Sequence, residues 1–388
     1  MISLASLLLL LSGNKTALNE GPQKKMRILK FLSIPIFLLA VFSYGFFVGK
    51  YNWFPYESLR SLKHTVTGVS SPSMEDAAPT FNVISGLENK LSIQDIKNLR
   101  NNISRYIIPT NQSDISVTNE NGNNIISTTY YGIISRGYLI SPSENQNNCL
   151  RIYVQGHGGS PPKFDYYNQI IDIFSNEGCD VLSLSMIGLG FNEGPASFPS
   201  RFGKVSLSLE QAKIHGNYSF FFDIDNPNLD PLSLFLHPHM QIIKYVKDQG
   251  DYKNISILGI SGGGWYTVWL AALLPELNTS LSYAGSFPLA YRKGTSIHGD
   301  WEQIYSNLYS KFSYLELYQL MLANEDGKRT RKSFLIYNDR DDCCFMDPSA
   351  TNFKDLVDGL DFYPKVIVDL NNKHSMNVNL VSSLLKRD

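Results

Sequence analysis

The chain has 388 residues, enough for one large α/β domain or two smaller ones. Hydrophobic residues make up 43% of it and charged residues only 18%, which excludes global disorder and favours a substantial core. The formal net charge is −1 and no long basic block lies outside the N-terminal region, so nucleic acid is not predicted as a partner.

The first predicted element is an apolar run from Ile28 to Val48, about 21 residues, which is long enough to cross a bilayer. Basic residues gather at its N-terminal side and aromatic residues at its far end, which favours a single-pass signal anchor. Residues 1–27 would then be cytoplasmic, with a physiological start at Met26 as an option, and the remaining chain would be periplasmic, extracellular or lumenal. A cleaved signal peptide and a buried core helix are the alternatives.

Residues 49–80 are polar, contain Ser and Pro, and lack apolar periodicity, so they predict a stalk before a domain at 81–388. The spacing of apolar residues predicts a short amphipathic helix from Leu91 to Ile108. Residues Ile125 to Ile140 predict two antiparallel strands with a break near Arg136-Gly137.

From Leu150 onward, apolar strands alternate with helices. The predicted helices run from Tyr166 to Ser175, His239 to Gln249 and Gly264 to Leu274, and the predicted strands are 150–155, 181–186, 255–260, 333–338 and 365–370. This alternation indicates an α/β fold with a mostly parallel sheet covered on both faces. In such sheets, functional groups collect at the carboxyl ends of the strands.

Three strand ends carry glycines. Gln155 to Ser160 (QGHGGS) would let a backbone N–H support negative charge on a substrate oxygen, or is an ordinary turn. Ser185 to Gly194 would shape a pocket. The stretch ILGISGGGW contains Gly259-Ile260-Ser261-Gly262-Gly263, which matches the G-x-S-x-G nucleophile elbow, although a glycine-rich loop without chemistry is the alternative. A serine hydroxyl needs a base to act as a nucleophile.

Two later strand ends supply an acid and a base. Tyr337 to Phe345 contains three acids just past a strand, and one carboxylate there would hold a histidine in the required tautomer. His374 follows the last predicted strand by a few residues. Taken singly, the acids are typical of solvated loops and the histidine of a surface or packing position.

The order of these segments along the chain resembles that of a known family. An oxyanion loop, then serine, acid and histidine, each just after a strand, is similar to the α/β-hydrolase superfamily from about Ile125 to the C-terminus. The resemblance implies Ser261 as nucleophile, His374 as general base and Asp341 as acid. Asp342 and Asp339 are the fallback acids, because Asn338 stands where the family pattern G-x-x-D has glycine. It also implies backbone oxyanion donors at Gly262 and in the His157-Gly158-Gly159 loop, with Gly159 favoured over Gly158.

The resemblance implies a serine hydrolase that cleaves small carboxylic esters through an acyl-enzyme, without a metal or cofactor. A peptidase of the prolyl-oligopeptidase type is an alternative, although no propeller-like repeat precedes the domain. A catalytically inactive, membrane-anchored binding module is the other. Residues 191–238 are long enough for a cap, whose aromatic residues would line an acyl pocket or belong to the core: Phe198, Phe202, Phe220 to Phe222 and Phe235.

The four cysteines lack the spacing of a zinc site. Cys149 and Cys179 each begin a predicted strand, and the resemblance implies that these strands are parallel neighbours, close enough for a disulfide. Two buried free thiols are the alternative. Cys343 and Cys344 are weaker candidates for a bond, because a bridge between adjacent residues strains the backbone.

Overall fold

The computed structural model describes residues 86–107, 114–120, 122–142, 147–200, 203–209, 229–292, 300–341, 343, 345, 349–371 and 373–386. The predicted cytoplasmic segment, the anchor at 28–48 and the stalk lie outside these residues, so they stay predictions. Among the residues that are described, none of the helices combines the length and the hydropathy needed to cross a membrane.

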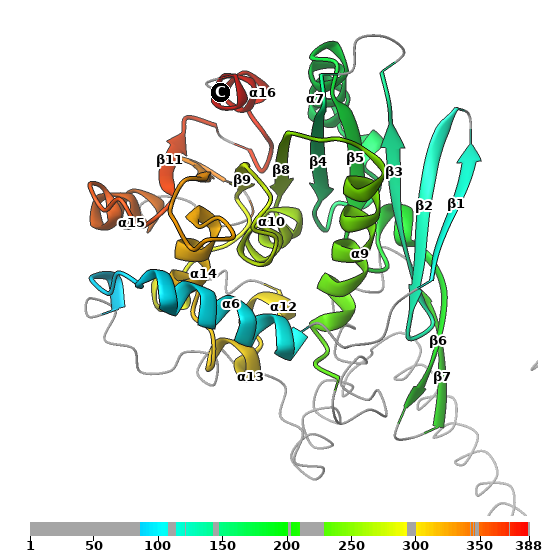
Figure 1. Cartoon of the computed structure of the whole chain (residues 1–388), viewed down its shortest axis with the longest axis horizontal. Coiled ribbons are helices and arrows are strands. Elements are labelled where there is room, and N and C mark those ends of the chain that lie inside the picture. Colours follow the sequence, from blue (N-terminus) through cyan, green and yellow to red (C-terminus); the bar gives the residue numbers. More distant parts are fainter. Residues whose placement is uncertain are drawn as a thin grey trace, which may run out of the picture. The chain divides into compact units, whose positions relative to one another are not determined.

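A nine-stranded sheet forms the centre of the described structure, in the order β1-β2-β3-β5-β4-β8-β9-β10-β11 (Figure 1). Its strands are β1 (Ile115–Glu120), β2 (Asn123–Tyr130), β3 (Ile133–Ile140), β4 (Cys149–Gln155), β5 (Asp180–Ser185), β8 (Asn254–Ile260), β9 (Thr279–Tyr283), β10 (Lys332–Asn338) and β11 (Lys365–Asp369). Pairing is antiparallel from β1 to β5 and parallel from β5 across to β11. The predicted mostly parallel α/β sheet is therefore confirmed.

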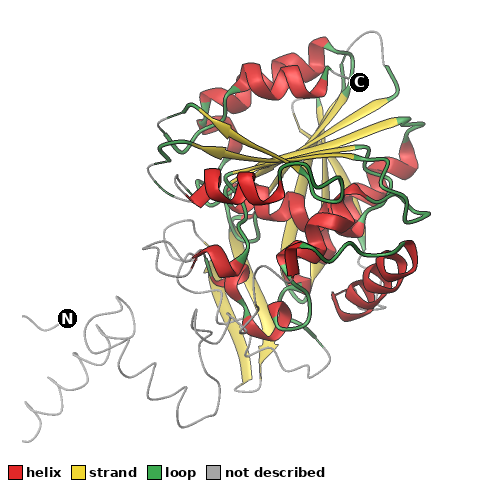
Figure 2. Cartoon of the chain, turned by 90° about the vertical axis from the view of Figure 1, so that its left-hand side faces the viewer, coloured by secondary structure: helices red, strands yellow, loops and turns green. Residues whose placement is uncertain are grey.

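Helices cover both faces of this sheet (Figure 2). One core joins the sheet to α7 (Asp165–Asn176) and α16 (Val378–Leu385). The opposite core joins it to α6 (Ile93–Ile107), α9 (Ser233–Gln249), α10 (Gly262–Leu273), α14 (Tyr314–Leu322) and α15 (Ser349–Val357). Adjacent residues of β4 show the division, since Tyr153 belongs to the first core and Val154 to the second. Shorter helices are η1 (Pro161–Lys163), η2 (Gly190–Asn192), α11 (Leu289–Arg292), α12 (Trp301–Ile304) and α13 (Ser306–Tyr309).

Most predicted elements from residue 91 onward are observed within a few residues of their expected ends, but the break near Arg136-Gly137 is wrong. The turn between β2 and β3 lies at Tyr131-Gly132, and Gly137 is inside β3, paired with Leu184 of β5. A Cβ at Gly137 would lie 2.9 Å from side-chain atoms of Ile242 and Leu182. The glycine there marks close packing under α9 and β5, not a turn.

The segment predicted as a cap contains a two-stranded antiparallel sheet, β6 (Gly194–Ser200) with β7 (Gly203–Leu209). The backbone N–H of Ser197 donates to the carbonyl of Gly132 at 3.4 Å, which places β6 beside the β2–β3 turn. Residues 233–238 already belong to α9. Phe235 lies there, fully buried against Trp265, so it is a core residue.

Cys149 and Cys179 form a disulfide with 4.8 Å between their Cα atoms. Leu150 of β4 pairs in register with Asp180 of β5. Cys149 and Cys179, each one residue earlier in the chain, therefore lie opposite each other. Of the two alternatives for these cysteines, the structure has the bridge.

Candidate active site

The strand β8 turns into α10 at Ser261, which has φ 58° and ψ −130°. A non-glycine residue rarely adopts a positive φ, and such strain collects at functional sites. Glycines make the turn possible, because a Cβ at Gly259 would lie 2.1 Å from the carbonyl oxygen of Gly263. A Cβ at Gly263 would lie 2.0 Å from that of Val154. Ser261 therefore stands at a sharp strand-to-helix turn, as the G-x-S-x-G pattern predicts.

The loop after β4 packs directly on this turn. A Cβ at Gly156 would lie 2.6 Å from Cβ of Ser261 and 2.9 Å from the backbone nitrogen of Gly262. Farther along the loop, Gly159 has φ 94°. A Cβ at Gly190, in the loop after β5, would lie 2.7 Å from the carbonyl oxygen of Gly159. Three of the predicted strand ends thus meet around Ser261.

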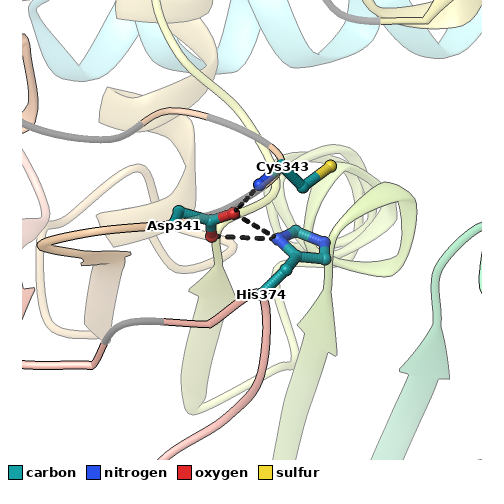
Figure 3. A group of neighbouring side chains, drawn as sticks. All are labelled: Asp341, Cys343 and His374. Atoms are coloured by element: carbon teal, nitrogen blue, oxygen red, sulfur yellow. Dashed lines mark hydrogen bonds and ion pairs between the residues drawn. The ribbon is translucent and has the colours of Figure 1, made fainter.

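Asp341 and His374 contact each other past the ends of β10 and β11. Nδ1 of His374 lies 3.0 and 2.9 Å from the two carboxylate oxygens of Asp341, and the other ring nitrogen points away from the acid (Figure 3). The side chain of Asp341 is fully buried, whereas that of His374 is 21% exposed. Of the fallback acids, Asp339 lies 3.6 Å from the guanidinium of Arg340, and Asp342 lies outside the described residues.

Asn338 explains the departure from the glycine pattern. Its fully buried amide donates to Asp341 at 3.0 Å and to the carbonyl oxygens of Lys373 and Ser375 at 2.9 and 3.3 Å. The backbone N–H of Cys343 donates to the other oxygen of Asp341 at 2.8 Å. One amide side chain therefore joins the acid loop to the backbone on both sides of His374.

Tyr283, at the end of β9, connects the serine turn with the histidine loop. Its carbonyl accepts from the backbone N–H of Ser261 at 2.9 Å, and its hydroxyl accepts from the backbone N–H of Asn377 at 3.2 Å. Sequence analysis missed both Tyr283 and the strand that carries it. The alternation of serine with apolar residues in TSLSY, Thr279 to Tyr283, was the available signal.

The serine turn, the glycine loop and the acid–histidine pair thus lie at one edge of the sheet, in the chain order Ser, Asp, His. The chain resembles the α/β-hydrolases. No family model matches it, and the comparison with curated proteins found no match.

Solved structures similar to this chain include three esterases. Est1E from Butyrivibrio proteoclasticus is 14% identical with a TM-score of 0.42, over 70% of this chain and 96% of that one. The acetyl xylan esterase from Paenibacillus sp. R4 is 13% identical with a TM-score of 0.47, over 80% and 98%. The methylesterase BT1017 is 13% identical with a TM-score of 0.49, over 83% and 66%.

A second charged cluster lies beside the glycine loop after β4. Nδ1 of His157 lies 3.2 Å from Asp300, and Nε2 lies 3.2 Å from Glu302. Burial alone would lower the pKa of His157, but the carboxylates of Glu302 and Asp300 outweigh it and raise the pKa. Burial raises the pKa of Glu302, and the contact with His157 offsets only part of that effect. The sequence offered no signal for Asp300 or Glu302.

Two groups among the described residues have metal-ligand atoms within 4.8 Å of one another: Asp341, Cys343 and His374, and His157, Asp300 and Glu302. Cys343 is disulfide-bonded, so it offers no thiolate. In the second group, each ring nitrogen of His157 already faces a carboxylate. Neither arrangement argues for a metal, and the absence of a cofactor stays a prediction.

Proposed function

We propose that the protein is a serine hydrolase that cleaves carboxylic esters through Ser261, His374 and Asp341. The observation that carries the proposal is the strained turn at Ser261 together with the buried carboxylate of Asp341 on Nδ1 of His374, at one edge of one sheet. The contact between Asp341 and His374 supports the division of roles in a Ser-His-Asp triad, where the acid fixes the tautomer and the histidine is the base.

In the proposed reaction, Nε2 of His374 takes the proton of the Ser261 hydroxyl as its oxygen bonds to the ester carbonyl carbon. The carbonyl electron pair moves to oxygen and forms a tetrahedral oxyanion. When the pair returns, the bond to the alcohol breaks, and the alcohol leaves with the proton held by His374. Water then attacks the acyl-enzyme by the same steps and releases the acid and Ser261. Asp341 remains ionised and stabilises the imidazolium.

Backbone N–H groups would bind the oxyanion. Gly262 is the first residue of the 12-residue helix α10, so its N–H lies at the positive end of the helix dipole. A second donor would come from the loop after β4, at Gly159 or Gly158, which packs on the serine turn. Such donors are worth about 10²–10³-fold in turnover when they are fixed before the reaction.

A further part of the proposal is that residues 28–48 anchor the protein and that the hydrolase domain lies outside the cytoplasm. The charge bias around that segment supports this orientation. The Cys149–Cys179 bridge supports it independently, because structural disulfides persist in oxidising compartments. A reporter fused after Asp388 is expected to be active only outside the cytoplasm, and activity confined to the cytoplasm would contradict the orientation.

The catalytic proposal is tested with a fluorophosphonate probe and a panel of short- and long-chain acyl nitrophenyl esters. Wild-type protein should be labelled and should release nitrophenol, and Ser261→Ala should do neither while keeping the wild-type melting temperature. Loss of a triad member costs on the order of 10⁴-fold in kcat. If Ser261→Ala kept more than a tenth of the wild-type activity, the assignment of Ser261 as the nucleophile would be wrong. Cleavage of peptide amides but not esters would favour the peptidase alternative, and no labelling of the wild type would favour a binding module.

A further inference from the structure

His157 lies between the glycine loop and two acids from a distant part of the chain. Its side chain is 7% exposed, and its two ring nitrogens each lie 3.2 Å from a carboxylate oxygen, of Asp300 at Nδ1 and of Glu302 at Nε2. Glu302 is fully buried, and Asp300 is 25% exposed. A buried carboxylate costs free energy unless a charged or hydrogen-bonding partner faces it. The buried carboxylate of Glu302 therefore favours a fixed position for the His157 ring beside it.

The same ring touches the serine turn. A Cβ at Gly262 would lie 2.7 Å from Cε1 and 2.8 Å from Nδ1 of His157, so the ring packs directly against the backbone of that residue. His157 itself belongs to the loop that carries Gly158 and Gly159. The ring therefore sets the spacing between the two segments that carry the proposed oxyanion donors.

Glu302 is fixed relative to the helix that begins at Gly262. The hydroxyl of Tyr309 donates to the carbonyl oxygen of Glu302 at 3.2 Å. That hydroxyl in turn accepts from the indole N–H groups of Trp265 and Trp269, both in α10, at 2.7 and 3.2 Å. A chain of contacts through Glu302 and Tyr309 therefore links the ring of His157 to α10.

We propose that His157 is a positioning residue, held between Asp300 and Glu302, that fixes the glycine loop against Gly262 and so preorganises the oxyanion hole. The inference rests on the proposed function and adds a residue to it. His157 does not touch the reacting atoms in this role. It acts through the two backbone N–H donors, whose placement within a fraction of an ångström decides how well they bind developing charge.

The role has a pH dependence with a defined sign. While the cluster keeps its proton, the charged ring has a carboxylate oxygen 3.2 Å from each of its nitrogens, so opposite charges attract on both sides. Loss of that proton leaves a neutral ring with a lone pair facing one of the acids. Among the described residues, the titratable groups that face the ring are Asp300 and Glu302. Burial raises the pKa of Tyr266 on α10, and the charge of Glu302 adds a smaller effect in the same direction. Because the pKa of His157 is raised above its usual value of 6.5, the contact should be complete below pH 6.5 and should weaken as the pH rises through the raised pKa.

The test compares His157→Gln and Glu302→Gln with the wild type in the full-length protein. Asp361→Asn is the matched control, because it removes a carboxylate whose ion pair with Lys90, at 2.8 Å, is exposed. The measurements are kcat and KM across pH 6–10 with a nitrophenyl ester, the rate of fluorophosphonate labelling, and the melting temperature. His157→Gln should lose about 10–100-fold in kcat with little change in KM, and labelling should slow in parallel.

Glu302→Gln keeps the size of the side chain and removes its charge, so it covers the case in which His157→Gln does not fold. It should move the alkaline decline of kcat to lower pH, whereas Asp361→Asn should match the wild type. If the folded variants have the kcat of the wild type and the same decline of kcat at alkaline pH, the inference is overturned and the proposed function still stands. Absence of Ser261-dependent turnover in the wild type would overturn both.

Discussion

Both carboxylate oxygens of Asp341 lie within 3.0 Å of Nδ1 of His374, and the acid is fully buried. A buried carboxylate in that position keeps the proton on Nδ1 and leaves Nε2 to act as a base. Asp341→Asn should therefore reduce kcat for ester hydrolysis by about 10⁴-fold without unfolding the protein. Asp339→Asn is the control, because Asp339 contacts Arg340 and should have little effect. Similar, mild losses in both variants would mean that the acid comes from another strand.

Asn338 holds the acid loop and the histidine loop together through one amide. Asn338→Ala would remove the amide donor from one oxygen of buried Asp341 and from the part-buried carbonyl oxygens of Lys373 and Ser375, the second of which keeps a hydrogen bond from Asn371. A buried group that loses its partner costs about 1–3 kcal/mol, so denaturant unfolding should show a loss in this range. The value of kcat should fall while KM stays near the wild type, because the base is displaced and the binding surface is not. Asn338→Asp, which is of equal size but cannot donate, should fail in the same way. Full activity in either variant would show that the histidine loop is held by other contacts.

His239 gives the fold a measurable sensitivity to acid. It is fully buried, with Nε2 2.8 Å from the carbonyl oxygen of Ser185, and burial lowers its pKa from 6.5 to about 4. Between those values the unfolded chain binds a proton that the folded chain does not, so stability is complete above pH 6.5 and is lost as the pH falls towards 4. The contribution is on the order of 3 kcal/mol. Urea unfolding between pH 7 and 4 should therefore show a smaller pH dependence in His239→Gln than in the wild type. Equal slopes would mean that the carboxylates alone account for the acid sensitivity.

The Cys149–Cys179 bridge closes a loop with a sequence separation of 30 residues. The chain-entropy account predicts about 3–4 kcal/mol of stabilisation for such a loop, although engineered bridges often give less. The double variant Cys149→Ser, Cys179→Ser should melt at a lower temperature than the wild type. Peptide mapping without reduction should recover the two cysteines in one linked fragment. Alkylation of both without prior reduction would show that the bridge is absent from the isolated protein.

The strand ends could be predicted because local patterns dictate them. The G-x-S-x-G turn needs glycines where the backbones of β4 and α10 approach, and buried parallel strands need apolar runs, so Ser261 and most of the sheet follow from short stretches. His374 and Asp341 could be placed by chain order and resemblance, and the contact of Asp341 with His374 agrees with the choice of Asp341 over Asp339.

Contacts between distant segments could not be predicted in this way. Asp300 and Glu302 lie more than a hundred residues from His157, and nothing in their neighbourhood marks them as its partners. Tyr283 had only a weak signal, because its strand is short and three of its five residues are serine or threonine. The turn at Tyr131-Gly132 was misplaced because Gly137 offers the same local signal, and only its packing against Leu182 and Ile242 separates a strand glycine from a turn glycine.

The disulfide joins β4 and β5 where these strands begin, and the candidate site lies where they end. A strand of seven residues spans about 20 Å, so the covalent crosslink and the chemistry occupy opposite ends of the same two strands. A reductant that breaks the bridge should therefore shorten the time for which the protein stays folded in a heated sample. At room temperature, the rate of the proposed ester hydrolysis per folded molecule should stay unchanged. Stability and the proposed activity can then be altered independently, and a more reducing environment should lower the amount of folded protein before it changes the activity of each folded molecule.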